Sequence, residues 1–364
     1  MLMNLPRVLV IDLWRALAIL LVVNHHGPNK FFLDQSPIQL VLEKILWFGH
    51  TGVDLFFVLS GYLITNLLLT EFEKYETVDV GRFLLRRFWK LYPPYIVLSL
   101  VTLFMFRGYD LGQLFRSLLF LNSYLQDFWS HTWSIAIEAH FYLLMAGIVW
   151  LDLKRGVKSL TKLFLARALL VVLVVPLSRG LTELFVTTNG IYYFSHYRLD
   201  GFFIGVGIAS LQFSKIALLD RIANKYWLPV AFLGLSILIL SAYLKLPKFG
   251  FLYAVFGLGL PAVGYGVLFW LTLCNCKTNV WLEKRRFLKA LSYIGQASYS
   301  IYLWHILTRH LLIAFFGENI SQFLLWILYL ACSLLIGILS YEFIERTSLA
   351  LRDRRKSSRA RITL

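Results

Sequence analysis

Charged residues are scarce in this 364-residue chain. Asp, Glu, Lys and Arg make up 15% of the positions, whereas hydrophobic residues make up 59%. A soluble domain carries about 25% charged residues to cover its surface. The deficit therefore excludes an ordinary soluble protein, and the mean hydropathy of +0.68 agrees with that conclusion.

Cysteine is also scarce, and several catalytic motifs are missing. Cys274, Cys276 and Cys332 lie in or beside apolar runs. They provide no disulfide framework, a single Cys-x-Cys is a weak metal signal, and we interpret them as small apolar packing residues. The chain has no Walker loop, no GxGxxG after a strand, and no HExxH, GxSxG or HxxxxD motif. These absences exclude nucleotide hydrolysis, zinc proteolysis and the common soluble acyl-transfer motif, and we expect no metal.

What the sequence has in abundance is long apolar runs. A run near 20 residues crosses about 30 Å of hydrocarbon as a helix, in which the backbone satisfies its own hydrogen bonds. Arg15 interrupts the first run and no cleavage site follows Val23, so we expect a retained helix and not a signal peptide. The sequence predicts an all-α integral membrane protein with about ten transmembrane helices, at residues 8–26, 50–70, 91–106, 132–151, 163–178, 198–213, 227–244, 251–273, 291–316 and 322–343.

Lysine and arginine are distributed unevenly between the predicted loops. If the N-terminus is cytoplasmic, the inner segments hold 26 of the 36 Lys and Arg residues. The outer segments hold eight, which are Lys30, Lys44, Arg107, Arg116, Arg179, Arg198, Lys245 and Lys248. This excess predicts that both termini are cytoplasmic, and it explains the net charge of +16 by membrane orientation and not by nucleic-acid binding. Short loops and the lack of an internal repeat predict one transmembrane domain over residues 1–345. Residues 346–364 are predicted to form a basic cytoplasmic tail on anionic lipid.

Several ionisable side chains fall inside the predicted spans, where each costs about 2.5–3.5 kcal/mol and usually has a partner or a function. On the predicted helix over 8–26, Arg15 and His26 share one face because eleven residues return to within about 20° of the same direction. Six groups lie at a similar depth in the outer half of the membrane: His26, Asp54, Glu138, Arg198, Asp200 and His305. Their convergence predicts a catalytic or transport cavity.

Structural interpretations of these residues stay open at this point. Asp200 and Arg198 are two residues apart and are equally consistent with a structural ion pair. Arg15 is also explained by a side chain that extends towards the inner interface. Glu138 and His26 are the hardest to explain in this way, because neither has a neutralising partner next to it in the sequence.

A basic segment, RFLLRRFWKLYPPY, lies at the predicted cytoplasmic surface. Arg82, Arg86, Arg87 and Lys90 recur at a spacing that places them on one side of a helix. This pattern is typical of ordinary positive-inside anchoring, which composition alone favours. The alternative is a patch that binds the phosphates of a cytosolic ligand such as a coenzyme A nucleotide. The adjacent Pro93–Pro94 pair is expected to start or break the next helix.

The order of these motifs resembles that of the acyltransferase-3 family of bacterial membrane O-acyltransferases. The resemblance rests on DLWRALAILLVVNHH, GVDLFFVLSGYLIT, RRFWKLYPPY, TWSIAIEAHFYLL, RLDGFFIG, SYSIYLWH and YEFIER, and it covers nearly the whole chain. It implies a ten-helix fold that moves an acyl group, usually acetyl, from cytosolic acyl-CoA to a hydroxyl of an extracytoplasmic glycan. It also implies that His26 is the catalytic histidine, with Arg15 as its partner on the helix, and that Arg86 and Arg87 meet coenzyme A.

The sequence departs from the family pattern at a few positions. Lys90 stands where the family usually has arginine, Ala139 and His140 replace Glu-Gln after Glu138, and His25 stands where an aromatic residue is common. Many family members carry an additional extracytoplasmic hydrolase-like domain, which we expect this chain to lack.

The predicted function is therefore transfer of an acyl group, acetyl in the first instance, from cytosolic acyl-CoA to a hydroxyl of a cell-surface polysaccharide or its lipid-linked precursor in the bacterial inner membrane. His26 is the predicted general base, oriented by Glu138 or Asp54, with an acyl-histidine intermediate as the alternative route. The predicted donor-binding residues are Arg15, Arg86, Arg87 and Lys90. The predicted acceptor-binding residues are Ser298, Tyr299, His305, Arg198 and Asp200.

Two other functions fit the same residues. A proton-coupled transporter or glycan flippase would use the buried ionisable groups as a relay, although the basic segment and the lack of repeats disfavour it. An acyltransferase that acts on an amine or on a small molecule is the second alternative.

Overall fold

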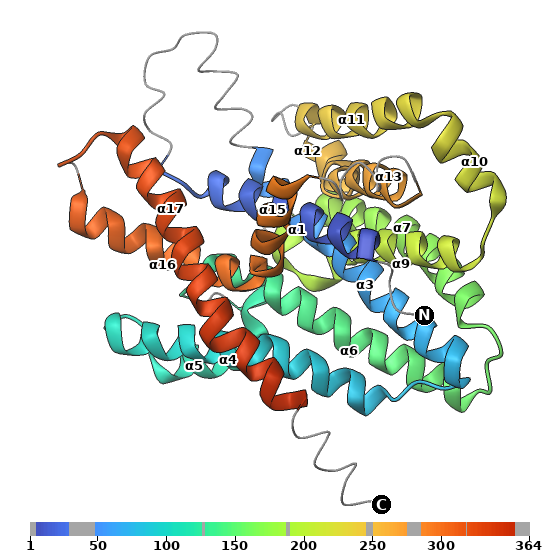
Figure 1. Ribbon diagram of the computed structural model, residues 1–364, viewed down its shortest axis with the longest axis horizontal. Coiled ribbons are helices and arrows are strands. Elements are labelled where there is room, and N and C mark those ends of the chain that lie inside the picture. The colour runs from blue at the N-terminus through green and yellow to red at the C-terminus, as the bar shows by residue number, and fades with distance from the viewer. Residues whose placement is uncertain are drawn as a thin grey trace, which may run out of the picture. The chain divides into compact units, whose positions relative to one another are not determined.

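The computed structural model describes residues 5–28, 48–125, 128–186, 190–244, 250–274, 285–317 and 319–353. Within these ranges every regular element is a helix (Figure 1), which confirms the all-helical fold. The chain divides into two compact units. Unit 1 contains residues 1–18, 50–78 and 137–295, and unit 2 contains residues 19–49, 79–136 and 296–364.

Unit 1 is built from the first part of α1 and the middle of the chain. α1 (Leu5–His25) and α6 (Trp133–Lys154) each begin in one unit and end in the other. The remaining elements of unit 1 are α3 (Gly52–Tyr75), α7 (Leu160–Phe185), α8 (Gly190–Tyr193), the 3-10 turn η4 (Ser195–Tyr197), α9 (Leu199–Phe213), α10 (Ala217–Lys225), α11 (Trp227–Leu244), α12 (Gly250–Leu252), the π-helix η6 (Tyr253–Gly257), α13 (Leu260–Cys274) and α15 (Arg286–Gln296).

Unit 2 contains the end of α1 and the C-terminal helices. Its other elements are α4 (Val80–Met105), α5 (Leu111–Leu118), the 3-10 turns η2 (Leu121–Ser123) and η3 (Ser130–Thr132), α16 (Ser298–Phe316), α17 (Gln322–Ser340) and the π-helix η7 (Tyr341–Glu345). The chain passes from unit 2 to unit 1 within the short 3-10 turn η1 (Gly49–Thr51).

The helices of the described ranges identify a multi-pass membrane protein. Seven of them are long and apolar enough to cross a membrane, and the bent pair α9 and α10, which meet at 108°, raises the number to eight if it is one span. This is fewer than the ten spans expected from the sequence. α1 and α16, at two of the predicted spans, are not among the seven. The orientation of the termini and the division at residue 345 stay predictions, and residues 354–364 of the basic tail lie outside the described residues.

The expectation that Pro93–Pro94 starts or breaks a helix is wrong. α4 is continuous from Val80 to Met105 and contains both prolines, so the basic segment and the predicted span over 91–106 belong to one helix. Proline at position 93 removes the backbone N–H that would bond to the carbonyl of Trp89. The Ser348 hydroxyl lies 3.0 Å from that carbonyl and 2.7 Å from the carbonyl of Glu345, so its one proton is shared between the two. A side chain from another segment therefore lies within hydrogen-bond distance of the acceptor that the proline leaves free.

In unit 1, small residues allow α3 and α9 to approach closely. A Cβ atom at Gly61 would lie 1.9 Å from the carbonyl oxygen of Phe202, and one at Gly205 would lie 2.1 Å from that of Val58. Beside this contact the Phe202 ring stacks on the Phe57 ring, with centroids 4.4 Å apart. The small residues Gly61 and Gly205 therefore allow this close approach, and it fixes the backbone on which Asp54 is placed.

In unit 2, α16 packs against α17 and η7. A Cβ atom at Gly337 would lie 2.5 Å from the Cα atom of Ile301. Two hydrogen bonds join the same segments: Trp304 Nε1 donates to Ser340 Oγ at 2.8 Å, and Ser300 Oγ donates to the buried Glu345 carboxylate at 2.7 Å. These contacts hold the helix that carries His305.

The described cysteines form no disulfide with each other. Cys274 and Cys332 are free thiols on half-buried residues. Cys276 lies outside the described residues, as do the predicted outer-loop lysines at positions 30, 44, 245 and 248.

Candidate active site

Unit 2 holds two histidines whose rings are in direct contact. His26 follows the last residue of α1, and His305 lies in the middle of α16. Their ring centroids are 5.0 Å apart, and His305 Nε2 lies 3.3 Å from His26 Nδ1. His26 is half-buried, whereas His305 has 0% exposure. Two of the residues predicted from depth alone therefore meet in the structure.

Backbone carbonyls determine which nitrogen of each ring carries a proton. His26 Nδ1 lies 2.9 Å from the carbonyl of Val22, and His305 Nδ1 lies 2.5 Å from the carbonyl of Tyr302. A carbonyl only accepts, so both Nδ1 atoms are donors, and in each neutral ring Nε2 carries the lone pair. His26 Nε2 is therefore the atom that can accept a proton from a substrate.

A third histidine, His131 in η3, completes the cluster and was not singled out from the sequence. Its ring lies 5.0 Å from that of His305 and 5.5 Å from that of Tyr302. The Tyr302 hydroxyl donates to the His131 carbonyl at 2.7 Å and accepts from Ser134 Oγ at the same distance. These bonds connect the HTWS and SYSIYLWH segments, so the position of His131 directly before Thr-Trp-Ser was the available signal.

The end of α1 is held by α17. Tyr329 donates to the carbonyl of Val23 at 3.0 Å, and Trp326 Nε1 donates to the side chain of Asn24 at 3.1 Å. Both contacts fall within three residues of His26. The position of the His26 backbone is thus fixed by two aromatic side chains from the C-terminal helix.

The basic side of α4 also belongs to unit 2. Arg86, Arg87 and Lys90 are half-buried, and the Arg87 guanidinium lies 5.9 Å from the centroid of the Phe83 ring. Arg82 is exposed and pairs with Asp79 at 3.2 Å at the start of the helix. Among the described residues, Arg86 has no acidic partner within ion-pair distance. The helix therefore presents cationic groups that suit a phosphate.

The two mid-span residues of the predicted acceptor site are buried. Ser298 has 0% exposure and Tyr299 has 8%. The Tyr299 hydroxyl donates to the carbonyl of Leu91 at 2.7 Å, one turn beyond the basic side of α4. This bond gives Tyr299 a role in joining α16 to α4.

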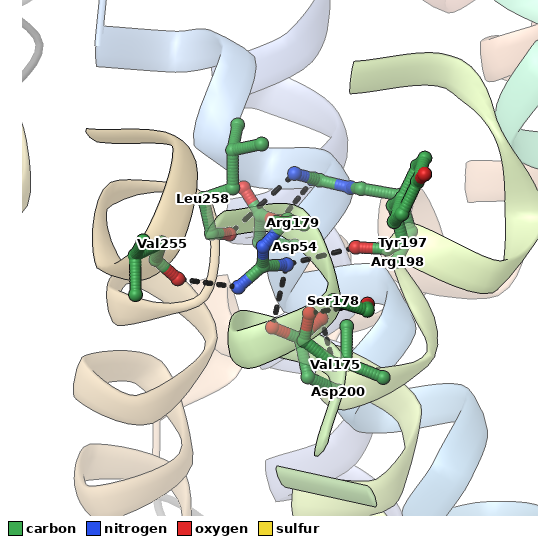
Figure 2. A network of polar contacts seen from close by, with 10 residues as sticks. Asp54, Val175, Ser178, Arg179, Tyr197, Arg198, Asp200, Val255 and Leu258 are labelled. Atoms are coloured by element: carbon green, nitrogen blue, oxygen red, sulfur yellow. Dashed lines mark hydrogen bonds and ion pairs between the residues drawn. The ribbon is translucent and has the colours of Figure 1, made fainter. Parts of the chain in front are cut away.

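In unit 1, two buried ion pairs occupy adjacent positions (Figure 2). Arg198 pairs with Asp54 at 2.5 Å, and Arg179 pairs with Asp200 at 2.8 Å. The neighbouring pair considered from the sequence, Asp200 with Arg198, is therefore not the direct one. Each carboxylate is neutralised by an arginine from another segment. Their exposure is 7% or less, so the pairing compensates a large desolvation cost.

Arg179 was not predicted to belong to the site, because the sequence places it in an outer loop. It lies inside α7 with 0% exposure and also donates to the carbonyl of Tyr197 at 2.8 Å and to that of Val255 at 3.0 Å. Val255 lies in the π-helix η6, whose irregular backbone directs this carbonyl at the guanidinium (Figure 2). The charge network therefore joins α7, α9 and η6.

Tyr192, in the short helix α8, borders this network. The Arg198 guanidinium lies 5.2 Å from the centroid of the Tyr192 ring. Burial raises the pKa of the Tyr192 phenol above its ordinary value. The phenol is therefore neutral at physiological pH and adds no charge to the two ion pairs.

Glu138 lies in α6, within unit 1, and accepts two hydroxyl hydrogen bonds. Ser60 Oγ from α3 donates to Glu138 Oε1 at 2.8 Å, and the Tyr142 hydroxyl donates to the same oxygen. Glu138 is half-buried. The neighbouring His140 is satisfied separately, because its Nδ1 lies 2.7 Å from Ser195 Oγ.

Arg15 has an acidic neighbour on its own helix. Its guanidinium lies 4.0 Å from the carboxylate of Asp12, which also accepts from Ser292 Oγ at 3.2 Å. A Cβ atom at Gly295 would lie 1.8 Å from the Asp12 carbonyl oxygen, so only glycine allows α15 to meet α1 here. Within the described ranges, no group of three His, Cys, Asp or Glu side chains is arranged to hold a metal.

Comparison with known proteins gives consistent matches. The family described as an acyltransferase domain (Acyl_transf_3) matches residues 8–342. Peptidoglycan O-acetyltransferase OatA of Listeria monocytogenes is 30% identical over 370 residues, which cover 92% of this chain and 54% of that protein. O-acetyltransferase OatA of Staphylococcus aureus (strain NCTC 8325) is 26% identical over 324 residues, which cover 82% of this chain and 52% of that protein. The chain thus spans about half the length of the curated relatives it matches. No solved structure matches it.

Proposed function

We propose that this chain, which belongs to the acyltransferase-3 family, transfers an acyl group, acetyl in the first instance, from cytosolic acyl-CoA to a hydroxyl of a cell-surface polysaccharide or its lipid-linked precursor. The observation that carries the proposal is the state of His26, whose Nδ1 donates to a backbone carbonyl while Nε2 keeps its lone pair. Such a ring is prepared to take the proton of a hydroxyl nucleophile.

The donor would be held by the cationic groups of α4. Guanidinium groups bind phosphate through paired N–H donors, and Arg86 and Arg87 are half-buried beside Lys90 on one helix. Acyl-CoA supplies the thioester that the hydroxyl attacks. Arg15, which is half-buried on α1, would contact the donor farther along its path.

His26 would act on the acceptor as a general base. Its Nε2 takes the hydroxyl proton as the oxygen attacks the thioester carbonyl, and Arg15 or a mid-span hydroxyl stabilises the developing oxyanion. An acyl-histidine intermediate on the same ring is the alternative order of steps. Glu138 is our proposed catalytic carboxylate, since Asp54 already neutralises Arg198 at 2.5 Å.

The acceptor class is supported by the names of the relatives, one of which is a peptidoglycan O-acetyltransferase. For this chain we place the acceptor on the extracytoplasmic side of the bacterial plasma membrane, with both termini cytoplasmic. The proposed acceptor-binding residues remain Ser298, Tyr299 and His305 in unit 2, and Arg198 and Asp200 in unit 1. The ion pairs of Arg198 and Asp200 favour a structural role for these two residues over direct contact with the sugar.

Radiolabelled acetyl-CoA and purified membranes test the proposal. The expected result is label in the glycan fraction, dependent on the protein and released by mild base as acetate. Glycan that moves across the membrane without receiving label would replace the enzyme with a transporter or flippase. Label on an amine or a small molecule, stable to mild base, would replace the acceptor class.

A further inference from the structure

The contact between His26 and His305 carries an inference about where the substrate proton goes. We propose that His305 is a positioning residue that receives a proton through His26 and returns it, so that the two imidazoles act as one base. This inference rests on the proposed function and deepens it. It starts from the 3.3 Å distance between His26 Nδ1 and His305 Nε2.

The tautomers of the two rings give the relay its direction. His305 Nδ1 donates to the Tyr302 carbonyl, so His305 Nε2 carries a lone pair, which lies 3.3 Å from His26 Nδ1. The N–H of His26 Nδ1 therefore has two acceptors, the Val22 carbonyl at 2.9 Å and His305 Nε2. The rings therefore form a chain of donor and acceptor that begins at His26 Nε2. Without His305, the Nδ1 proton of His26 would face only the Val22 carbonyl, which does not take up a proton.

The step balances in atoms and charge. The acceptor O–H breaks and its proton goes to His26 Nε2, while the proton on His26 Nδ1 goes to His305 Nε2. The hydroxyl oxygen forms the new bond to the acyl carbon, and the C–S bond of acyl-CoA breaks. The proton then returns from His305 to His26 Nδ1, and the proton on His26 Nε2 goes to the thiolate. The products are an ester and a thiol.

The burial of His305 and the groups around the two rings favour the return of the proton from His305 to His26. His305 has 0% exposure, whereas His26, which lies 3.3 Å from it, is half-buried and borders more accessible space. The titratable and charged groups that act on the pair in the described residues are His25, His131, Arg309 and Tyr302. None of them is a carboxylate, so no anion within this group holds the proton on His305.

The geometry of His305 is itself held on both sides. The His131 ring contacts it at a centroid distance of 5.0 Å, and the carbonyl of Tyr302 holds Nδ1. A ring held in this way keeps Nε2 aimed at His26. The relay thus accounts for a fully buried histidine in a membrane protein, where a polar group usually has a partner or a function.

The decisive variant is His305→Gln, whose amide oxygen accepts a hydrogen bond but does not take up a proton. With radiolabelled acetyl-CoA, membranes and purified peptidoglycan as the acceptor, we expect the single-turnover rate to fall about 10- to 100-fold, with the donor concentration at half-saturation unchanged. In mixtures of H2O and D2O, the rate of the unchanged protein should vary along a bowed curve, because two protons move. His305→Gln should give a straight line.

Controls keep this test independent of folding and of the proposed function. His310→Gln, on the same helix but at an exposed position, should keep the rate and the bowed curve. His305→Asn keeps an N–H donor for the Tyr302 carbonyl and should still show the reduced single-turnover rate. The amount of each variant in the membrane and its monodispersity after purification report whether it has folded. A His305→Gln rate within twofold of the unchanged protein, or an equally bowed curve, would overturn the relay. Absence of label transfer by the unchanged protein would instead overturn the proposed function.

Discussion

Removing the guanidinium of Arg179 should destabilise the protein more than any loss of a surface ion pair. The Arg179→Met substitution leaves the Asp200 carboxylate buried without its arginine, and it removes the donors to the carbonyls of Tyr197 and Val255. Breaking a buried pair from one side costs about 3–5 kcal/mol. The free energy of unfolding should fall by that amount, measured by tryptophan fluorescence of the purified protein in graded SDS.

A surface pair of similar geometry provides the control. Arg346 and Glu342 are 2.7 Å apart, but Arg346 is 66% exposed. Arg346→Met should therefore cost no more than about 1 kcal/mol. Adding Asp200→Asn to Arg179→Met should recover part of the loss, because the uncompensated charge is removed. A loss below about 1 kcal/mol for Arg179→Met, or a double variant no more stable than the single one, would refute the reasoning.

Two further predictions concern packing and the donor. Gly61→Ala places a Cβ atom 1.9 Å from the Phe202 carbonyl oxygen and should lower the unfolding free energy by about 2 kcal/mol or more. Gly147→Ala is the control, because its Cβ atom would have no neighbour within 4 Å, and the substitution should not lower the unfolding free energy. Arg86→Gln should raise the KM for acetyl-CoA about tenfold, equivalent to about 1.4 kcal/mol, with little change in kcat. An unchanged KM in the same membrane assay would remove Arg86 from the donor site.

The membrane fold was largely predictable because hydropathy is a local property of the chain. The all-helical fold and the family resemblance are confirmed. The course of α4 was not predictable, because the hydroxyl that approaches the freed carbonyl of Trp89 belongs to Ser348, 259 residues away. The break at Ala297, between α15 and α16, follows directly after the segment in which Gly295 meets Asp12. Contacts of this kind leave no periodic signal in the sequence.

The candidate site was predictable in its residues but not in their pairing. Depth along each helix selected His26 and His305, which the structure brings together. Depth also selected Asp54, but its partner Arg198 is 144 residues away, and one sequence does not reveal which arginine it meets. Arg179 was missed because its position in α7 extends beyond the predicted apolar run.

The most direct test of the central claim compares two adjacent histidines in the acetyl-transfer assay. His25 and His26 are neighbours with ring centroids 5.0 Å apart, but only His26 lies against His305 in the contacts described above. His26→Ala should lower the transfer of label from acetyl-CoA to glycan by at least about 100-fold, and His25→Ala should retain most of it. Full transfer by His26→Ala together with loss in His25→Ala would contradict the account.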